Sequence, residues 1–376
     1  MNQNGSQKLI ARLREQLSQF PDNRMPFSIY MSSCLYDVEH GYYMSHRPKV
    51  GRDGDFYTSV YVGDFMAQMI SRYIVQRTAA RGWQPEQVRI VEWGAGPGRL
   101  AAQLLRALYA NDYTPYSYTM VEASAHHRTE AEQTLVPLLS AQTQIEWWDM
   151  AEFQRCASHS PVIFIANELL DAFPIERVRW ATSHFEQAYV CWDERKDRLE
   201  LIWGPASSDV IQWMKQHQIH LRNEQIYEAH ISGTVWLSQV MQSMAAAEMI
   251  FIDYGDITEE LTASHRMNGS LMCYRNHIAS DDPFAAPGEQ DLTSFVDFDV
   301  FKHVVLHTGT GECIVYPLIH QQQFLLEYGI MDLLQSHADL NPFSEVARHN
   351  RAIRQLLLSD HMSERFKVMR ISKGPL

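Results

Sequence analysis

The chain has 376 residues, 45% of them hydrophobic and 20% charged, as is typical of a folded globular protein with one elaborated domain or two. Its net charge of −13 argues against a nucleic-acid-binding surface, and its apolar runs are shorter than the roughly 18 residues that a membrane span requires. The five cysteines are scattered without a C-x-x-C pair, and no His, Cys or Asp cluster has the spacing of metal ligands. Together with a polar N-terminus that lacks a signal-peptide core, this predicts a cytoplasmic protein without a metal site.

The first 85 residues are expected to form a mostly helical N-terminal portion. Apolar side chains at the spacing of one helix face predict helices over residues 7–20 and 62–78. Between them, the stretch 51–59, GRDGDFYTS, has the glycine- and aspartate-rich composition of a loop. This portion would cap or accompany the rest of the chain.

From residue 86 onward, strands and helices are predicted to alternate. The strands cover residues 88–92, 118–122, 145–148 and 162–166, and the helices cover 99–109, 127–138 and 150–156. This alternation predicts an α/β fold with a doubly wound, Rossmann-like parallel sheet, whose ligands bind at the carboxyl ends of the strands. The polar residues at those ends, which should converge on one crevice, are Glu92, Glu122, Asp149, Asn167 and Glu168.

The pattern changes after Pro174. Residues 185–192 and 199–203 predict a β-hairpin and residues 208–217 and 230–247 predict helices, so we expect an inserted α+β subdomain over 185–247. A buried strand at 249–253 resumes the core. Residues 269–277 and 283–293 are expected to be extended loops, followed by a helix at 293–305, a strand at 312–316 and a helix at 319–327. The core would therefore comprise residues 86–184 and 248–376.

The glycine-rich segment 88–98, VRIVEWGAGPG, is the strongest candidate for a ligand-binding turn. Gly94, Gly96 and Gly98 follow a buried strand and precede a helix, a geometry that lets a ligand approach the backbone at a helix N-terminus. An ordinary strand–turn–helix without a ligand is the alternative. A dinucleotide fingerprint would place its third glycine where Arg99 stands, and the unpaired carboxylate of Glu92 would repel a pyrophosphate.

The same acids suit a different nucleotide-like ligand. Glu92 fits the ammonium group of an amino acid, Glu122 can accept hydrogen bonds from a ribose diol, and Asp149 can accept from an adenine amino group. Ribose, adenine and a cationic amino acid together describe S-adenosylmethionine. NAD remains open as the alternative cofactor.

Several motifs resemble those of the MidA-like, S-adenosylmethionine-dependent methyltransferases, whose mitochondrial relatives assist respiratory complex I assembly as protein arginine methyltransferases. The resemblance extends in the expected order over most of the chain. The matching segments are His40–Tyr43 (HGYY), Gly54–Ser59 (GDFYTS), Val91–Gly98 (VEWGAGPG), Ala166–Pro174 (ANELLDAFP), Phe251–Gly255 (FIDYG), Tyr274–His277 (YRNH), Pro287–Thr293 (PGEQDLT) and Val296–Phe298 (VDF). Two departures are Val60, where the family usually has proline, and Met272, where it tends to have arginine.

The resemblance implies a class I methyltransferase sheet and a set of site residues. For the cofactor these are Glu92, Gly94, Ala95, Gly96, Gly98, Glu122, Asp149 and Met150, with Asp55 and Thr58 from the loop at 54–59. An arginine acceptor is cationic, so carboxylates should orient its guanidinium through paired contacts. Asn167, Glu168 and Asp171 are therefore the catalytic candidates, with a helix-terminal or structural role as the alternative for both acids.

Other polar residues are assigned to the acceptor pocket. Asp253, Tyr254 and Arg275 are expected to bind the substrate, although Asp253 could equally hold a loop, and His277 could act as a base near neutral pH. Asp291 and Asp297 are interpreted mainly as caps or loop anchors.

The resulting hypothesis is a methyltransferase that modifies a protein side chain such as arginine. A small-molecule methyltransferase and a non-catalytic assembly or protein-binding factor with a retained S-adenosylmethionine fold are the alternatives. The expected partner is a protein substrate rather than nucleic acid or membrane, and a homodimer is one of the oligomeric states left open.

Overall fold

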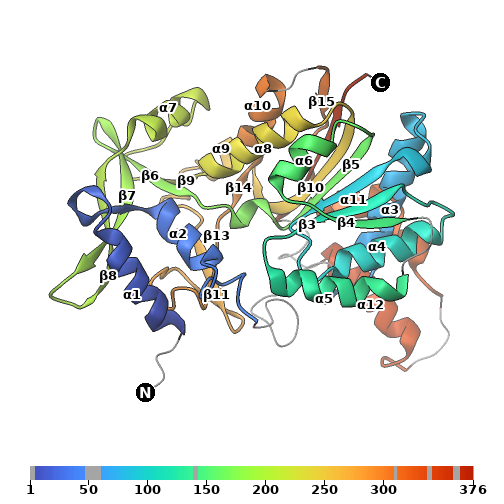
Figure 1. Ribbon diagram of the computed structural model, residues 1–376, viewed down its shortest axis with the longest axis horizontal. Helices are drawn as coiled ribbons and strands as arrows, with labels where there is room; N and C mark the ends of the chain where they lie inside the picture. Colours follow the sequence, from blue (N-terminus) through green and yellow to red (C-terminus); the bar gives the residue numbers. More distant parts are fainter. Residues whose placement is uncertain are drawn as a thin grey trace. The chain divides into compact units, whose positions relative to one another are not determined.

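The computed structural model describes residues 5–46, 61–138, 143–308, 311–336, 341–358 and 365–375. The chain divides into two compact units, each built from separate stretches of sequence (Figure 1). The first unit comprises Met1–Phe56, Leu170–Leu237 and Gly255–Val304, and the second comprises Tyr57–Leu169, Ser238–Tyr254 and Val305–Leu376. Among the helices of the described residues, none has the length and apolar character needed to cross a membrane.

A mostly parallel sheet forms the centre of the second unit. Its strand order is β15-β17-β10-β5-β2-β3-β4, in which β2, β3, β4, β5 and β10 run parallel and β17 pairs antiparallel with both β10 and β15. The bounds are β2 Arg89–Trp93, β3 Ser117–Val121, β4 Gln144–Trp147, β5 Val162–Asn167, β10 Ala247–Asp256, β15 Cys313–Val315, β16 Ile319–His320 and β17 Phe366–Lys373. Strand order reverses beside β2, which lies between β3 and β5, so the predicted doubly wound sheet is confirmed.

Helices cover both faces of this sheet, which explains why its strands are apolar on both sides. Ile163 and Ile165 of β5 join one large core with side chains from α3, α4, α11 and α12. Phe164, between them in sequence, faces the other way and packs against Phe153 of α6 and Phe251 of β10. The helices are α3 Phe65–Ala80, α4 Arg99–Tyr109, α5 Ala125–Leu135, α6 Met150–Cys156, α11 Gln321–Glu327 and α12 Glu345–Leu358.

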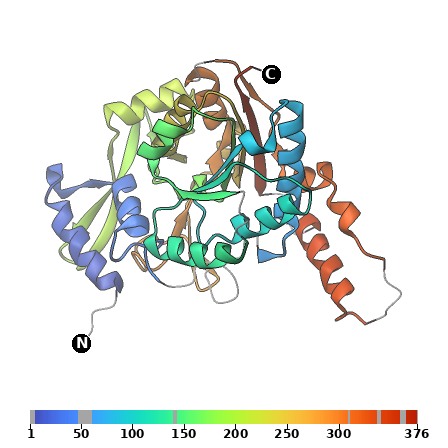
Figure 2. The same ribbon diagram turned by 45° about the vertical axis from the view of Figure 1, so that its right-hand side comes forward.

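Antiparallel sheets form the first unit (Figure 2). One sheet has the order β1-β7-β6-β9 with β8 paired to β7, and the smaller one has the order β12-β11-β13. The helices α1 and α2 pack against each other, and both contact β7. The bounds are α1 Gly5–Leu17, β1 Met25–Pro26, α2 Phe27–Tyr36, β6 Glu176–Ala181, β7 His184–Asp193, β8 Arg198–Pro205, α7 Ser208–Gln216, β9 Ile226–Ala229, α9 Thr258–Leu261, β11 Met272–Arg275, β12 Ile278–Ser280, β13 Asp291–Thr293 and β14 Val296–Asp297. Two helices, α8 (Ile231–Ser243) and α10 (Phe298–Thr308), continue from this unit into the second.

The compact units have other boundaries than the domains expected at 1–85, 86–184 with 248–376, and 185–247. Strand β1 pairs with β7 and α1 packs on the same strand, so the N-terminal segment associates with the predicted hairpin. Strand β6, which was not predicted, pairs with both β7 and β9 and brings residues 170–184 into the same unit. Helix α3 instead packs against α4 of the parallel sheet.

Two local predictions were wrong, and one strand was missed. Residues 269–277 and 283–293 were expected to be extended loops, but they contain β11 and β13, two strands of the β12-β11-β13 sheet. The helix expected from residue 293 begins at Phe298, because Asp297 accepts hydrogen bonds from the backbone N–H groups of Asp299 (3.1 Å) and Val300 (3.3 Å) and so caps it, as interpreted from the sequence. The C-terminal strand β17 was not anticipated at all.

Candidate functional site

Each of the three glycines in the turn after β2 has a positive φ, a backbone conformation that favours glycine. Gly94, Gly96 and Gly98 have φ of 74°, 52° and 73°. A Cβ on Gly98 would lie 2.7 Å from the Cβ of Ala131, so glycine there permits close approach of α4 and α5. A Cβ on Gly96 would meet no described heavy atom within 4 Å. The turn therefore leaves open space at Gly96 while it is packed at Gly98.

The carboxylate of Glu122 anchors this turn from the end of β3. Its Oε2 accepts the N–H of Gly96 (2.9 Å) and its Oε1 accepts the N–H of Ser124 (2.8 Å), with His127 Nδ1 3.8 Å away. Burial alone would raise the pKa of Glu122, but the nearby His127 imidazole and the hydrogen bonds from the N–H groups of Ser124 and Gly96 lower it below its ordinary value. Glu122 is thus ionised, and carboxylate oxygens have further lone pairs for hydroxyl donors.

Glu92 is buried rather than open to a ligand in this structure. Only 3% of its surface is exposed, and its Oε2 accepts a 2.6 Å hydrogen bond from the hydroxyl of Tyr118 on β3. Burial raises the pKa of Glu92 to about 8, with the Tyr118 hydrogen bond opposing and the charge of Glu122 adding to this rise. The sequence analysis did not identify Tyr118. It could have been found from the register, because Glu92 pairs with Met120 and Tyr118 projects from the same face as Met120.

The raised pKa of Glu92 predicts a pH dependence of stability. Between the ordinary pKa of 4.5 and about 8, the unfolded chain loses a proton that the folded chain keeps, so the free energy of unfolding should fall as pH rises, by up to about 1.4 kcal/mol per pH unit. Glu92→Gln removes this contribution. Urea denaturation at pH 5, 6, 7 and 8 should show a flatter pH dependence for the variant than for the parent, whereas parallel curves would contradict a neutral, buried Glu92.

Asp149 and Met150 lie at the start of α6, after β4. Asp149 is the N-cap: its Oδ1 accepts the N–H of Glu152 (2.8 Å), and Glu152 Oε2 accepts the N–H of Asp149 (3.0 Å). The capping box by itself explains why an acidic residue stands at position 149. Asp149 is exposed and Met150 is partly buried, so both stand at the sheet edge where an adenine contact was predicted.

Asn167 and Glu168 end β5, the strand next to β2, and form a hydrogen-bonded pair. Glu168 Oε1 accepts from Asn167 Nδ2 at 3.2 Å. Because this oxygen accepts from the amide nitrogen, the nitrogen faces it and the amide oxygen faces away. That oxygen is buried with no hydrogen-bond partner among the described residues. Because a Cβ on Gly94 would lie 2.9 Å from Cδ1 of Leu169, the turns after β2 and β5 meet, as predicted from the topology.

Asp253 and Tyr254 come from β10, on the other side of β5. Asp253 is 1% exposed; its Oδ2 accepts the N–H of Leu169 (2.9 Å) and its Oδ1 the N–H of Tyr254 (2.8 Å). Tyr254 stacks on Phe366 with ring centroids 3.9 Å apart. These contacts are those of the loop-holding role that was the alternative to substrate binding.

The remaining described candidates belong to the first unit. Asp171 lies in a short 3-10 turn, Leu170–Ala172, and is 6% exposed. Arg275 donates to Glu289 at 2.7 Å. His277 is exposed at the two-residue turn between β11 and β12, where it and Asn276 have φ of 62° and 50°, the conformation of a type I′ hairpin. The predicted cofactor contacts Asp55 and Thr58 lie outside the described residues.

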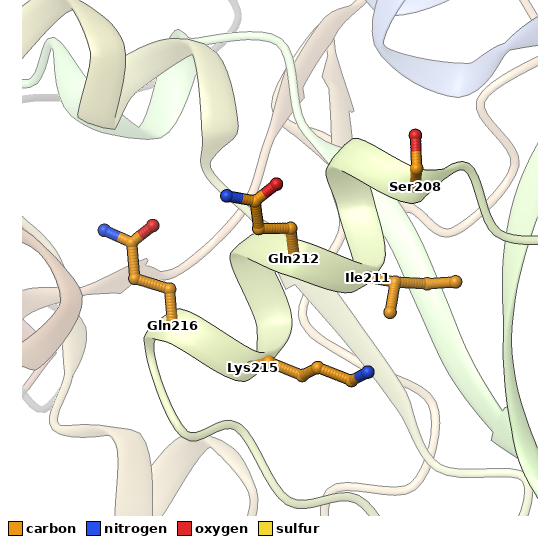
Figure 3. Close-up of a pocket in the computed structure, with 5 residues that line it drawn as sticks. All are labelled: Ser208, Ile211, Gln212, Lys215 and Gln216. Carbon is orange, nitrogen blue, oxygen red and sulfur yellow. The ribbon is translucent and has the colours of Figure 1, made fainter.

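The part of the chain that the structure describes contains no group of three or more His, Cys, Asp or Glu side chains arranged to hold a metal ion. A hollow on α7 is lined by Ser208, Ile211, Gln212, Lys215 and Gln216, all from this one helix, and Figure 3 shows these side chains along its surface. None of the predicted site residues lines it.

Comparison with known proteins decides among the cofactors considered. The profile of a family of S-adenosyl-L-methionine-dependent methyltransferases matches residues 69–313 of this chain. The chain belongs to this methyltransferase family. NDUFAF7 of Xenopus tropicalis, named as a mitochondrial protein arginine methyltransferase, is 24% identical to the methyltransferase over 367 residues, covering 90% of this chain and 80% of the relative. The human protein of the same name is 23% identical over 326 residues, covering 80% and 69%.

Solved structures agree with this assignment. The fold of the methyltransferase matches a crystal structure from Burkholderia thailandensis bound to S-adenosyl-homocysteine, with a TM-score of 0.86, 29% identity, and coverage of 98% of this chain and 93% of the other. A native crystal structure from the same organism matches with a TM-score of 0.83, 28% identity, and coverage of 98% and 92%. The methyltransferase uses S-adenosylmethionine as its cofactor, as predicted.

The residues present fit this cofactor. Open space at Gly96 lies beside an ionised carboxylate, Glu122, at the point where strand order reverses. Glu122 can accept hydroxyl donors of a ribose, and the turn keeps side chains out of the space at Gly96. Glu92 is enclosed by Tyr118 and the surrounding core in this arrangement.

Proposed function

We propose that the chain transfers a methyl group from S-adenosylmethionine to a guanidinium nitrogen of an arginine side chain in a protein. The S–CH3 bond breaks as the N–CH3 bond forms, S-adenosylhomocysteine leaves, and the nitrogen releases a proton. The observation that carries this proposal is the pair of acceptors at the end of β5: the Glu168 carboxylate and the buried Asn167 Oδ1, which has no partner among the described residues. A buried oxygen of this kind is satisfied by a ligand that brings N–H donors. A guanidinium offers five such donors in one plane and a positive charge that matches Glu168.

S-adenosylmethionine, when bound, supplies an electrophilic methyl group on a sulfonium. The chain's own contribution is to hold the acceptor nitrogen in line, since proximity and orientation provide much of the rate of such a displacement, about 7–11 kcal/mol in favourable cases. Glu168 accepts an N–H of the guanidinium and stabilises its charge, while Asn167 Oδ1 accepts a second N–H and fixes the plane. The names of the curated relatives as protein arginine methyltransferases support the same acceptor.

Isotope labelling tests the acceptor directly. The protein is incubated with methyl-labelled S-adenosylmethionine and a cell extract, and both the digested proteins and the small-molecule fraction are analysed by mass spectrometry. We expect label on arginine side chains, and synthetic peptides copied from the labelled segments should accept methyl groups until their arginine is replaced with lysine. Label confined to small metabolites would favour the small-molecule alternative, and binding of S-adenosylhomocysteine without any transfer would favour the non-catalytic one.

A further inference from the structure

The turn that carries Glu168 has an unusual backbone conformation. Glu168 has φ of 53°, in the left-handed region that residues other than glycine, asparagine and aspartate rarely adopt. Such a conformation persists only where the surrounding structure imposes it, and it is often associated with function. The question is which groups of the second unit impose it here.

Strand β10 holds this turn through two consecutive N–H groups. The N–H of Glu168 donates to the carbonyl oxygen of Ile252 at 2.8 Å, which continues the β5–β10 ladder. The next N–H, that of Leu169, donates to Oδ2 of Asp253 at 2.9 Å. A ladder bond alone is compatible with an ordinary extended residue, whereas the bond from Leu169 to a side chain directs the next N–H away from the ladder and so favours a turn at Glu168.

Asp253 is itself fixed for this task. Its other oxygen, Oδ1, accepts the N–H of Tyr254 at 2.8 Å, and the side chain is 1% exposed. Both carboxylate oxygens thus bond to backbone N–H groups, which makes these hydrogen bonds charge-assisted and directional. A buried carboxylate used in this way is placed to support a neighbouring turn rather than to touch a substrate.

We propose that Asp253 is a positioning residue: by accepting the N–H of Leu169, it holds Glu168 in the left-handed conformation that sets its carboxylate beside Asn167 for the acceptor. This inference rests on the proposed function in one respect, that the Asn167–Glu168 pair binds the acceptor. The role of Asp253 in holding the turn at Glu168 does not depend on which acceptor binds. The role replaces the direct substrate contact expected for Asp253 from the sequence.

The kinetic test is Asp253→Asn. Asparagine has one acceptor oxygen in place of two, so one backbone N–H loses its partner and the turn can relax. We expect kcat/KM for an arginine peptide to fall by about 10- to 100-fold, the order that one hydrogen bond to a charged group contributes. The dissociation constant of S-adenosylhomocysteine, measured by calorimetry, should stay within about twofold of the parent because the glycine turn and Glu122 are unchanged. An equal loss in cofactor affinity would overturn the proposal.

Asp256 provides the matched control. It lies at the end of the same strand, and its Oδ1 accepts the N–H of Ile257 at 2.9 Å. Asp256→Ala removes this side-chain acceptor from a backbone N–H, whereas asparagine would keep an oxygen for it, and the substitution leaves residues 167–169 unchanged. Its kcat/KM for the arginine peptide and its dissociation constant for S-adenosylhomocysteine should both remain near those of the parent. A loss of kcat/KM as large as that of Asp253→Asn would show that any disturbance of β10 has this effect.

A double-mutant cycle tests the role of Asp253 in the turn without any activity. Glycine adopts a positive φ freely, so Glu168→Gly removes the backbone strain. In the parent, loss of Asp253 lets Glu168 relax and recover the strain; in the glycine background there is no strain to recover. Asp253→Asn should therefore raise the unfolding equilibrium constant more in the Glu168→Gly background than in the parent, by a further factor of about five to thirty, which is the usual cost of a left-handed residue.

The two measurements separate the possible failures. Additive effects in the cycle would overturn the role of Asp253 in the turn, even if the protein methylates arginine. A coupled cycle together with an absence of methyl transfer to arginine would leave that role in place and contradict the proposed acceptor. Failure of both the single and the double variant to fold would also overturn the inference, because Asp253 would then be needed by the core as a whole.

Discussion

Gly96→Arg is expected to abolish cofactor binding while the protein stays folded. The space that a side chain on Gly96 would enter contains no described atom within 4 Å, and we assign this space to the cofactor. An arginine side chain there would occupy it, so the dissociation constant of S-adenosylhomocysteine should rise by about 100-fold or more. The backbone cost is separate, since a non-glycine residue at φ 52° costs about 1–2 kcal/mol in the free energy of unfolding.

Gly82→Arg is a control with matched backbone and surroundings. Gly82 has φ of 64°, lies in the same compact unit after α3, and a Cβ on it would also meet no described atom within 4 Å. Its substitution should cost the same 1–2 kcal/mol or so in urea denaturation and leave the calorimetric affinity unchanged. Equal affinities for the two variants would contradict the assignment of the space at Gly96 to the cofactor.

The sheet could be predicted where local sequence patterns determine the structure. The helices at 99–109 and 150–156 have the expected bounds. The first begins directly after Gly98, which ends the glycine turn, and the second begins directly after its N-cap residue, Asp149. Strand β17 could not be predicted in this way. Phe366–Lys373 is separated from its partner β10 by more than a hundred residues, and its charged ends do not have the continuous apolar character of the other central strands. Pairing partners so distant in sequence are set by tertiary packing rather than local propensity.

The site was predicted better in its location than in the roles of its residues. Topology alone places Glu92, Glu122 and Asn167 at the ends of adjacent strands, and the structure has them there. Sequence does not reveal which carboxylates are exposed. Glu92 is enclosed with Tyr118, Asp149 forms a capping box and Asp253 bonds to Leu169, and each of these depends on neighbours across the sheet or one helical turn away. The left-handed conformation of Glu168 could not be predicted from the sequence, because glutamate is uncommon in that conformation and its residue type does not indicate it.

Glu168→Gly and Glu168→Ala are expected to separate stability from methyl transfer. At most positions alanine is more stabilising than glycine, by about 0.5–1 kcal/mol. At φ 53° the Cβ of alanine is disfavoured, so the order should invert, with the glycine variant more stable by about 1 kcal/mol in urea denaturation. Both variants lack the carboxylate, and kcat/KM for the arginine peptide should fall by about 100-fold or more, since two hydrogen bonds to a charged group are involved.

Asp112→Gly is the matched control for this pair. Asp112 follows α4 in the same unit, has φ of 54° and is exposed. Replacing it with glycine should relieve less strain than at Glu168, because aspartate adopts this conformation more readily than glutamate, and should leave methyl transfer and S-adenosylhomocysteine affinity unchanged. If Glu168→Gly instead kept the parental kcat/KM, the carboxylate would have no part in acceptor binding. If it were less stable than Glu168→Ala, the left-handed conformation at Glu168 would carry no strain. The expected result is a site that retains a strained residue because its carboxylate is needed there, as in other proteins where activity is maintained at the expense of stability.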